Sequence, residues 1–315
     1  MRRKRKNNYI IILVVAIVLI GLALFSVHNV HHRTKVTTNT SYQVNETATL
    51  NKSTQLYSSL KASKSTTLSA STTVKVKKYY LVTADDQKTT YAQVSLNGKN
   101  YYVKAKNLAL TMNNSVNKYI AQLGYPHAKI TKKIYKQFEK RSYKTTSGKP
   151  KGVVIHDTGT DYSTLSGEVN YMEQNYKTDD VFVHTFVDAS QILNIANTKY
   201  MAQGAGPKAN PYYVQFEMPH EYSAKGFATQ TANAAYYTAY ILRKNNLPVT
   251  KGTKSGSGTV WTHDMVSNYL GGTDHEDPTS YWEDTAEHYF GSSYNINDFI
   301  ELVQAYYNQL GSTNN

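Results

Sequence analysis

The stretch VWTHDMVSNYLGGTDHEDP, from Val260 to Pro278, gathers two histidines and four acidic residues within nineteen positions. It also holds the pair Gly271-Gly272, which favours a turn, and it ends at a proline, which cannot continue a helix. Imidazole and carboxylate groups bind divalent metals and transfer protons. We therefore expect the functional centre of the protein to be built around this stretch.

A second segment, KGVVIHDTGT, places a histidine at the end of a strand. Residues 152–155 are apolar on both faces, which is typical of a central strand, and His156 follows where a polar turn begins. A lone histidine in this position is more often structural than a ligand. Because His263 and Asp277 are also available, two imidazoles and one carboxylate can leave a fourth tetrahedral position for water, as in catalytic zinc sites.

Other acidic residues compete for the carboxylate position of this site. Asp274 and Glu276 could each replace Asp277, but Asp277 precedes a proline and is therefore conformationally restricted. Asp157 and Asp264 directly follow the two histidines, and we interpret them as turn residues or as supports for the ligands.

The last part of the chain alternates strand and helix patterns, which predicts a mixed α/β domain over residues 150–311 with a central sheet flanked by helices. Strands are expected at 152–155, 181–188, 192–196 and 212–219, and helices at 164–176, 229–246 and 297–310. In the strand YYVQFEMP, Glu217 lies on the face opposite Val214 and Phe216, so its carboxylate points away from part of the core.

Composition limits the chemistry and the partners. The chain has 315 residues and no cysteine, so any metal must be held by His, Asp or Glu. The charge is divided unevenly: residues 1–148 carry 25 Lys and Arg against 4 Asp and Glu, whereas residues 149–315 carry 10 against 18. The basic half predicts a polyanionic partner, and the compartment decides which one.

The N-terminus resembles a membrane anchor. Five basic residues lie within positions 2–6, and an uncharged, mainly aliphatic run follows from Tyr9 to Val27. Such a run is long enough to span a hydrocarbon core of about 30 Å. The positive charges before the run place the N-terminus in the cytoplasm and the rest of the chain outside. We expect a single-pass membrane protein with extracellular domains, or a secreted one if this segment is a cleaved signal, and no nucleic-acid partner.

A small all-β module is expected between the anchor and the α/β domain. Short β-branched and aromatic runs are separated by polar turns, and Asn97-Gly98 favours a two-residue hairpin. The segment TYAQVSLNGKNYYVKAKNLAL resembles the end of an SH3-like wall-binding module of the GW type, with Tyr101-Tyr102 in place of the Gly-Trp pair. Lysines beside tyrosines on these strands predict binding of anionic wall polymers such as teichoic acids, and a solvated spacer is the alternative.

These patterns divide the chain into successive segments. We predict a cytoplasmic basic tail (1–8), a transmembrane signal anchor (9–27), a linker (28–47), an SH3-like module (48–110), a basic connector (111–149) and the catalytic domain (150–311).

Four motifs of the last domain, in order, resemble those of the zinc-dependent N-acetylmuramoyl-L-alanine amidases of the type 2 family, which includes autolysin domains and peptidoglycan-recognition proteins. The motifs are VVIHDTGT, HTFVDASQILNIANTKYMAQGAG, YYVQFEMP and VWTHDMVSNYLGGTDHEDP. The resemblance implies zinc bound by His156, His263 and Asp277. It also implies acid–base and oxyanion roles for Glu217 and His275.

The resemblance further implies that the substrate is peptidoglycan and that the bond cut joins muramic acid to L-alanine of the stem peptide. His184 occupies a position that favours a wall of the substrate groove, with a structural role as the alternative. Two other functions stay open: peptidoglycan recognition without cleavage, and a zinc peptidase acting within the stem peptide.

Overall fold

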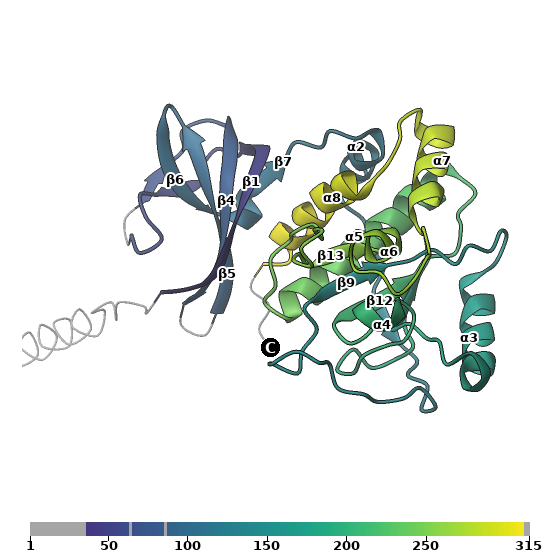
Figure 1. Cartoon of the computed structure of the whole chain (residues 1–315). Coiled ribbons are helices and arrows are strands. Elements are labelled where there is room, and N and C mark those ends of the chain that lie inside the picture. The colour runs from purple at the N-terminus through teal and green to yellow at the C-terminus, as the bar shows by residue number, and fades with distance from the viewer. Residues whose placement is uncertain (1–35, 63–64, 85–86, 312–315) are drawn as a thin grey trace, which may run out of the picture.

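The computed structural model describes residues 36–62, 65–84 and 87–311 of the chain. Two sheets lie side by side, as Figure 1 shows, and helices flank the second one. The predicted tail and anchor lie outside the described residues. Within the described ranges, no helix is long and apolar enough to cross a membrane.

The first sheet has seven strands in the order β3-β2-β6-β5-β4-β1-β7, and its paired neighbours run antiparallel. Its elements are β1 (Thr37–Leu50), β2 (Gln55–Tyr57), β3 (Ser65–Thr67), β4 (Thr72–Ala84), β5 (Gln87–Leu96), β6 (Lys99–Lys104), η1 (Ala105–Asn107) and β7 (Leu108–Leu110). Asn97 and Gly98 join β5 to β6 with φ of 50° and 75°, as a type I′ turn requires. The predicted all-β module and its hairpin are therefore confirmed, whereas its SH3-like character stays a prediction.

The predicted linker is wrong over its second half, because residues 37–47 form most of β1. This strand pairs with β4 on one side and β7 on the other, so its backbone groups are bonded within the sheet. Its side chains are mainly polar, but Tyr42, Ala48 and Leu50 are buried. The threonines of this predicted linker are β-branched residues that suit a strand.

The second sheet has six strands in the order β13-β9-β12-β10-β11-β8. These strands are β8 (Ile130–Lys132), β9 (Gly152–Ile155), β10 (Thr185–Val187), β11 (Ile192–Asn194), β12 (Tyr213–Glu217) and β13 (Val260–Thr262). The β10–β11 pair is antiparallel and the other four pairs are parallel. The mixed sheet is as predicted, but β8 extends it into the segment predicted to be a connector, so the domain begins well before residue 150.

Helices cover both faces of this sheet. They are α2 (Ser115–Gln122), α3 (Leu165–Asp179), α4 (Gly206–Ala209), α5 (Ala224–Lys244), α6 (His263–Tyr269), α7 (Thr279–Phe290) and α8 (Ile296–Gln309). The side chain of Ser223 accepts a hydrogen bond from the amide of Gly226 and caps α5, so this helix begins five residues before the predicted start at Thr229.

One hydrophobic core runs through both sheets. Tyr42 and Tyr79 of the first sheet belong to the same buried cluster as Leu302 of α8 and Ile241 of α5. Figure 1 shows α8 and α5 on the side of the α/β domain that faces the first sheet. The two sheets therefore form one packed unit.

A chain of buried hydrogen bonds crosses between the sheets. The hydroxyl of Tyr42 donates to Gln304 (2.9 Å), Gln304 donates to Asn308 (2.8 Å), and Asn308 donates to the hydroxyl of Tyr79 (3.1 Å). Tyr79 in turn donates to Glu46 (2.7 Å). Each of these buried polar groups thus has a partner in the first sheet or in α8, and separating the sheet from the helix would leave several of them unpaired.

Candidate metal centre and substrate groove

Three parallel strands end at the same edge of the second sheet. Ile155, the last residue of β9, pairs with Phe216 of β12 and with Thr262 of β13. Carboxyl ends of parallel strands form the usual binding edge of an α/β sheet. His156 directly follows β9, Glu217 is the last residue of β12, and His263 directly follows β13. These three residues are therefore neighbours at this edge.

The two histidines meet the carboxylate of Asp277 at this edge. The Nδ1 atoms of His156 and His263 lie 2.9 Å apart. Oδ2 of Asp277 lies 3.2 Å from Nδ1 of His156, and Oδ1 lies 3.0 Å from Nδ1 of His263. One nitrogen or oxygen from each residue falls within 4.8 Å of the others, and both imidazoles are buried. The structure thus brings together the three residues predicted as ligands.

The chemistry of these groups suits a divalent cation. Burial lowers the pKa of His156, which favours the neutral imidazole that binds metals. Burial alone would raise the pKa of Asp277, but the hydrogen bonds and charges of His156 and His263 outweigh burial and hold it below its usual range. Two imidazoles and an ionised carboxylate with converging lone pairs fit a zinc ion.

The loop after α6 holds the ligands in place. Gly271 and Gly272 have φ of 75° and 85°, which form the predicted turn and bring Thr273 back to the site. The hydroxyl of Thr273 lies 3.0 Å from Nε2 of His263. The carbonyl oxygen of Asp277 accepts a hydrogen bond from the amide of Asp264 (3.0 Å). Asp264 therefore supports a ligand, as predicted for it.

Glu217 lies beside the three residues in an enclosed position. Its Oε2 atom is buried and has no hydrogen-bond partner among the described residues. Burial raises the pKa of Glu217 well above its usual value, and the negative charges of Asp277, Asp157 and Glu168 add to the effect. A carboxyl group whose surroundings favour the protonated form is suited to transfer a proton during a reaction.

His275 lies on the solvent side of the centre. Its ring stacks on that of His263, with centroids 4.5 Å apart and planes 11° apart. Its Nδ1 lies 3.5 Å from Oδ1 of Asp277, and about two thirds of the side chain is exposed. This exposed imidazole can reach a molecule bound in front of the ligands.

A groove of about 730 Å³ contains the centre. His156, His263, Asp277, Glu217 and His275 all line it. Asp274 and Glu276, the alternative ligands, also line the groove but do not belong to the converging group. The groove is thus an open cavity lined by three candidate metal ligands, and by Glu217, which can transfer a proton.

His184 is not part of this groove, so its predicted role as a groove wall is wrong. The residue is fully buried. Its Nδ1 accepts a hydrogen bond from the amide of Gln215 (3.0 Å), and its Nε2 lies 2.8 Å from the carbonyl oxygen of Tyr200. Burial lowers its pKa to about 4, so the ring is neutral. The structural alternative describes His184: it ties β10 to β12.

His220 belongs to the surroundings of the site, although no sequence pattern identified it. Its Nε2 lies 3.1 Å from Oδ1 of Asp157, and its Nδ1 lies 3.1 Å from Oδ1 of Asp161. Its ring stacks on Tyr281 at 4.2 Å. Asp157 also accepts a hydrogen bond from the amide of Gly159, as expected of a turn residue. His220 therefore fixes the turn that follows His156.

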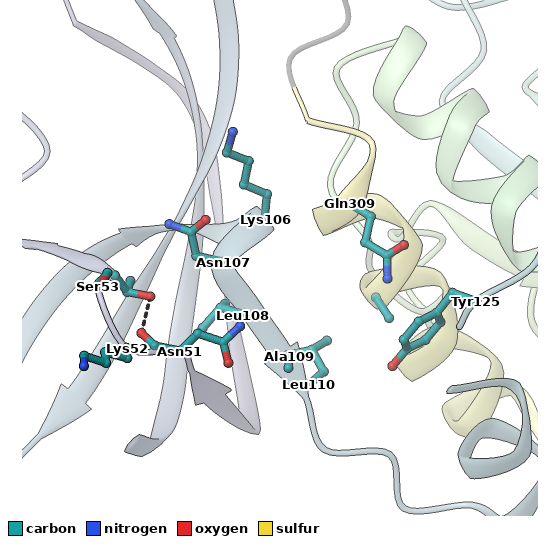
Figure 2. Close-up of a pocket in the computed structure, with 12 residues that line it drawn as sticks. Asn51, Lys52, Ser53, Lys106, Asn107, Leu108, Ala109, Leu110, Tyr125 and Gln309 are labelled. Atoms are coloured by element: carbon teal, nitrogen blue, oxygen red, sulfur yellow. Dashed lines mark hydrogen bonds between the residues drawn. The ribbon is translucent and has the colours of Figure 1, made fainter. Parts of the chain in front are cut away.

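A second cavity lies between the two sheets and has a different character. Figure 2 shows Asn51 and Lys52, from the loop after β1, and Lys106 of η1 on one side, and Tyr125 and Gln309 on the other. Its volume is about 420 Å³. None of its lining residues belongs to the converging metal-binding group.

Comparison with known proteins agrees with this geometry. Residues 146–280 match the N-acetylmuramoyl-L-alanine amidase family. Protein Ami of Listeria monocytogenes is 43% identical over 192 residues, which cover 61% of this chain and 20% of that protein. The bifunctional autolysin of Staphylococcus aureus (strain NCTC 8325) is 41% identical over 170 residues, covering 54% of this chain and 13% of that protein.

The chain thus matches a fifth or less of the length of these curated relatives. Among solved structures, the Staphylococcus aureus hydrolase AmiA in complex with its ligand is 38% identical with a TM-score of 0.57. That match covers 62% of this chain and 92% of AmiA. The chain therefore belongs to the type 2 N-acetylmuramoyl-L-alanine amidase family.

Proposed function

We propose that the protein is a zinc-dependent peptidoglycan hydrolase that cleaves the amide bond between N-acetylmuramic acid and L-alanine of the stem peptide. The observation that carries this proposal is the convergence of His156, His263 and Asp277 beside an enclosed Glu217 in one open groove. Family membership supports the choice of substrate and bond.

An amide is a poor electrophile, so its hydrolysis needs an activated water, a polarised carbonyl and a proton for the leaving amine. Zinc held by His156, His263 and Asp277 would supply Lewis-acid polarisation and make water more acidic. Glu217 lies in the groove beside the three ligands, where it can accept a proton from water and deliver one to the amine, and burial raises its pKa, which favours proton transfer. His275 faces the open side and can donate a hydrogen bond to the developing oxyanion.

Digestion of purified peptidoglycan tests this function against its two alternatives. New L-alanine amino termini with intact glycan are expected. Cleavage within the stem peptide would instead identify a peptidase, and retention on peptidoglycan without any release would identify a recognition protein. The proposed substrate lies outside the cell membrane, so export of the folded part of the chain belongs to this proposal.

We also propose that the first sheet binds anionic wall polymers such as teichoic acids. Register places three lysines and three tyrosines in adjacent outward rows of β4, β5 and β6: Lys75, Lys78, Tyr80, Tyr91, Tyr102 and Lys104. Amines in this position attract phosphate groups. Retention on purified walls should fall as salt rises, and retention that ignores ionic strength would contradict the proposal.

A further inference from the structure

Two tyrosines form an exposed stacked pair beside the catalytic groove. Tyr162 is 80% exposed and Tyr222 is 45% exposed. Their ring centroids lie 4.4 Å apart and their planes differ by 13°. One face of Tyr162 packs on Tyr222, which leaves the other face open. Paired aromatic rings in solvent contribute little to the core and mark a binding surface more often than isolated ones do.

The backbone holds this pair in an unfavourable conformation. Tyr162 has φ of 57°, in the left-handed region that bulky residues rarely adopt. Its amide donates a hydrogen bond to the hydroxyl of Tyr222 (2.7 Å), and that hydroxyl donates to Asp161 (3.2 Å). An asparagine or glycine would suit this turn better and would expose no ring. The local backbone therefore does not explain why a tyrosine occupies position 162.

Contacts connect the pair to the catalytic centre. Asp161 bonds His220, and His220 bonds Asp157, which directly follows His156. A cavity of about 380 Å³ is lined by Asp161, His220 and Tyr222, and it shares Ser280 with the catalytic groove. The tyrosine pair thus lies beside a cavity that adjoins the metal-binding residues.

A further cavity also adjoins the catalytic groove. A cavity of about 130 Å³ shares Thr158, Val181 and Glu217 with the catalytic groove and is lined by Tyr171 and Met172. A molecule that extended from the centre into both cavities would meet His220 and Tyr222 in the first, and Tyr171 and Met172 in the second.

We propose that the Tyr162–Tyr222 pair binds the glycan strand of peptidoglycan, with a sugar ring stacked on the open face of Tyr162. This inference rests on the proposed function, which places a glycan on one side of the cleaved bond and a peptide on the other. A pyranose presents a flat face of C–H bonds, which suits the negative face of an aromatic ring. Asp161 and His220 offer hydrogen-bonding groups to hydroxyl and acetamido substituents.

The charge of the cavity beside Tyr222 argues against an anionic ligand there. Three carboxylates line the adjacent cavity, those of Asp161, Glu221 and Asp284. They would repel the phosphates of wall polymers but not a neutral sugar.

The test measures binding without hydrolysis, on the full chain carrying Glu217→Ala. The probe is a strand of alternating N-acetylglucosamine and N-acetylmuramic acid without stem peptides, whose lactyl carboxylates are converted to amides so that the strand is uncharged. Its binding is measured by calorimetry. Tyr162→Asn removes the ring and tolerates the left-handed backbone, and it should raise the Kd roughly threefold to tenfold. Tyr162→Phe keeps the ring and should stay within about twofold of the parent. Tyr171→Ala, in the second cavity, should not change the Kd for this probe.

Unchanged affinity in Tyr162→Asn would overturn the inference, provided that its thermal unfolding matches the parent's. This outcome is separate from failure of the proposed function. A protein that binds strands through Tyr162 but releases no L-alanine termini from peptidoglycan would disprove the hydrolase and leave the glycan site intact. A protein that hydrolyses peptidoglycan but binds strands equally with and without the Tyr162 ring would do the reverse.

Discussion

Nδ1 of His156 lies 2.9 Å from Nδ1 of His263, although 107 positions separate the two residues in the chain. Parallel pairing of β9 with β13 produces this contact, because Ile155 and Thr262 stand opposite each other and the histidines follow them. A neutral imidazole carries its single N–H group on one of its two nitrogens, and the other nitrogen keeps a lone pair. The remaining lone pairs, with those of Asp277, are available to a cation.

Zinc should stabilise the folded protein. A ligand that binds only the folded state at about 100 times its Kd adds about 2.7 kcal/mol, which corresponds to a rise of the melting temperature of about 5 °C or more. We expect this rise when zinc is added to chelator-treated protein in a thermal melt. His263→Ala should abolish it, whereas His288→Ala, on the exposed side of α7, should keep it. An equal rise in both variants would place the ion elsewhere.

Replacing Glu217 by Gln should separate catalysis from metal binding. The amide keeps the size of the side chain but cannot transfer the proton, so turnover of peptidoglycan should fall by about 10²- to 10⁴-fold. The zinc-induced rise in melting temperature should persist. Glu276→Gln removes a carboxylate from the same groove and should leave turnover nearly unchanged. Full activity of the Glu217 variant would remove this residue from the mechanism.

Stability should depend on pH through Glu46 at the contact between the sheets. Burial raises the pKa of Glu46 to about 7 from 4.5, against the hydrogen bond from Tyr79, and the charge of Glu301 adds to the rise. Between about pH 4.5 and about pH 7, Glu46 holds its proton more tightly in the folded protein than in the unfolded chain. The free energy of unfolding should therefore fall as the pH rises from about 4.5 through about 7, and level off above.

Thermal melts across this pH range check the effect on the whole protein. Glu46→Gln cannot ionise, so it should flatten the contribution of this residue and raise the melting temperature at pH 8 more than at pH 5. A variant that keeps the slope of the parent protein would assign the pH dependence to another group.

Loss of Arg243 should destabilise the contact between α5 and the first sheet. This buried guanidinium donates to the hydroxyl of Thr90 and the carbonyl oxygen of Lys88, and it lies over the ring of Tyr307 at 4.9 Å. Arg243→Ala should lower the free energy of unfolding by about 2 kcal/mol. Lys244→Ala, an exposed neighbour on the same helix, should change it by less than about 0.5 kcal/mol. Denaturant unfolding followed by circular dichroism measures both.

The sequence predicted the parts of the site that follow simple periodicity. The apolar run before His156 and the alternation around Glu217 identified two strands of the sheet and the side chains at their ends. His184 was misplaced for the same reason: strand pattern tells which face a residue occupies but not what covers that face. His220 could not be found, because its partners Asp157 and Asp161 come from a turn some sixty residues earlier.

The first strand shows a different limit of sequence reasoning. Residues 37–47 have a polar, threonine-rich composition, and polarity dominated the prediction of a linker. The strand forms because β4 and β7 offer hydrogen-bonding edges on both sides, and these edges arise from residues far along the chain. Local composition contains no information about such partners.

The shared core has a mechanical consequence. Because Tyr42 and Tyr79 are bonded to α8, the first sheet cannot pivot as a module on a flexible tether. A polymer held on the outward rows of β4 and β6 would therefore meet the edge that carries His156, His263 and Asp277 at a fixed angle and offset. A change in the angle between the bound polymer and this edge would require the whole folded protein to rotate.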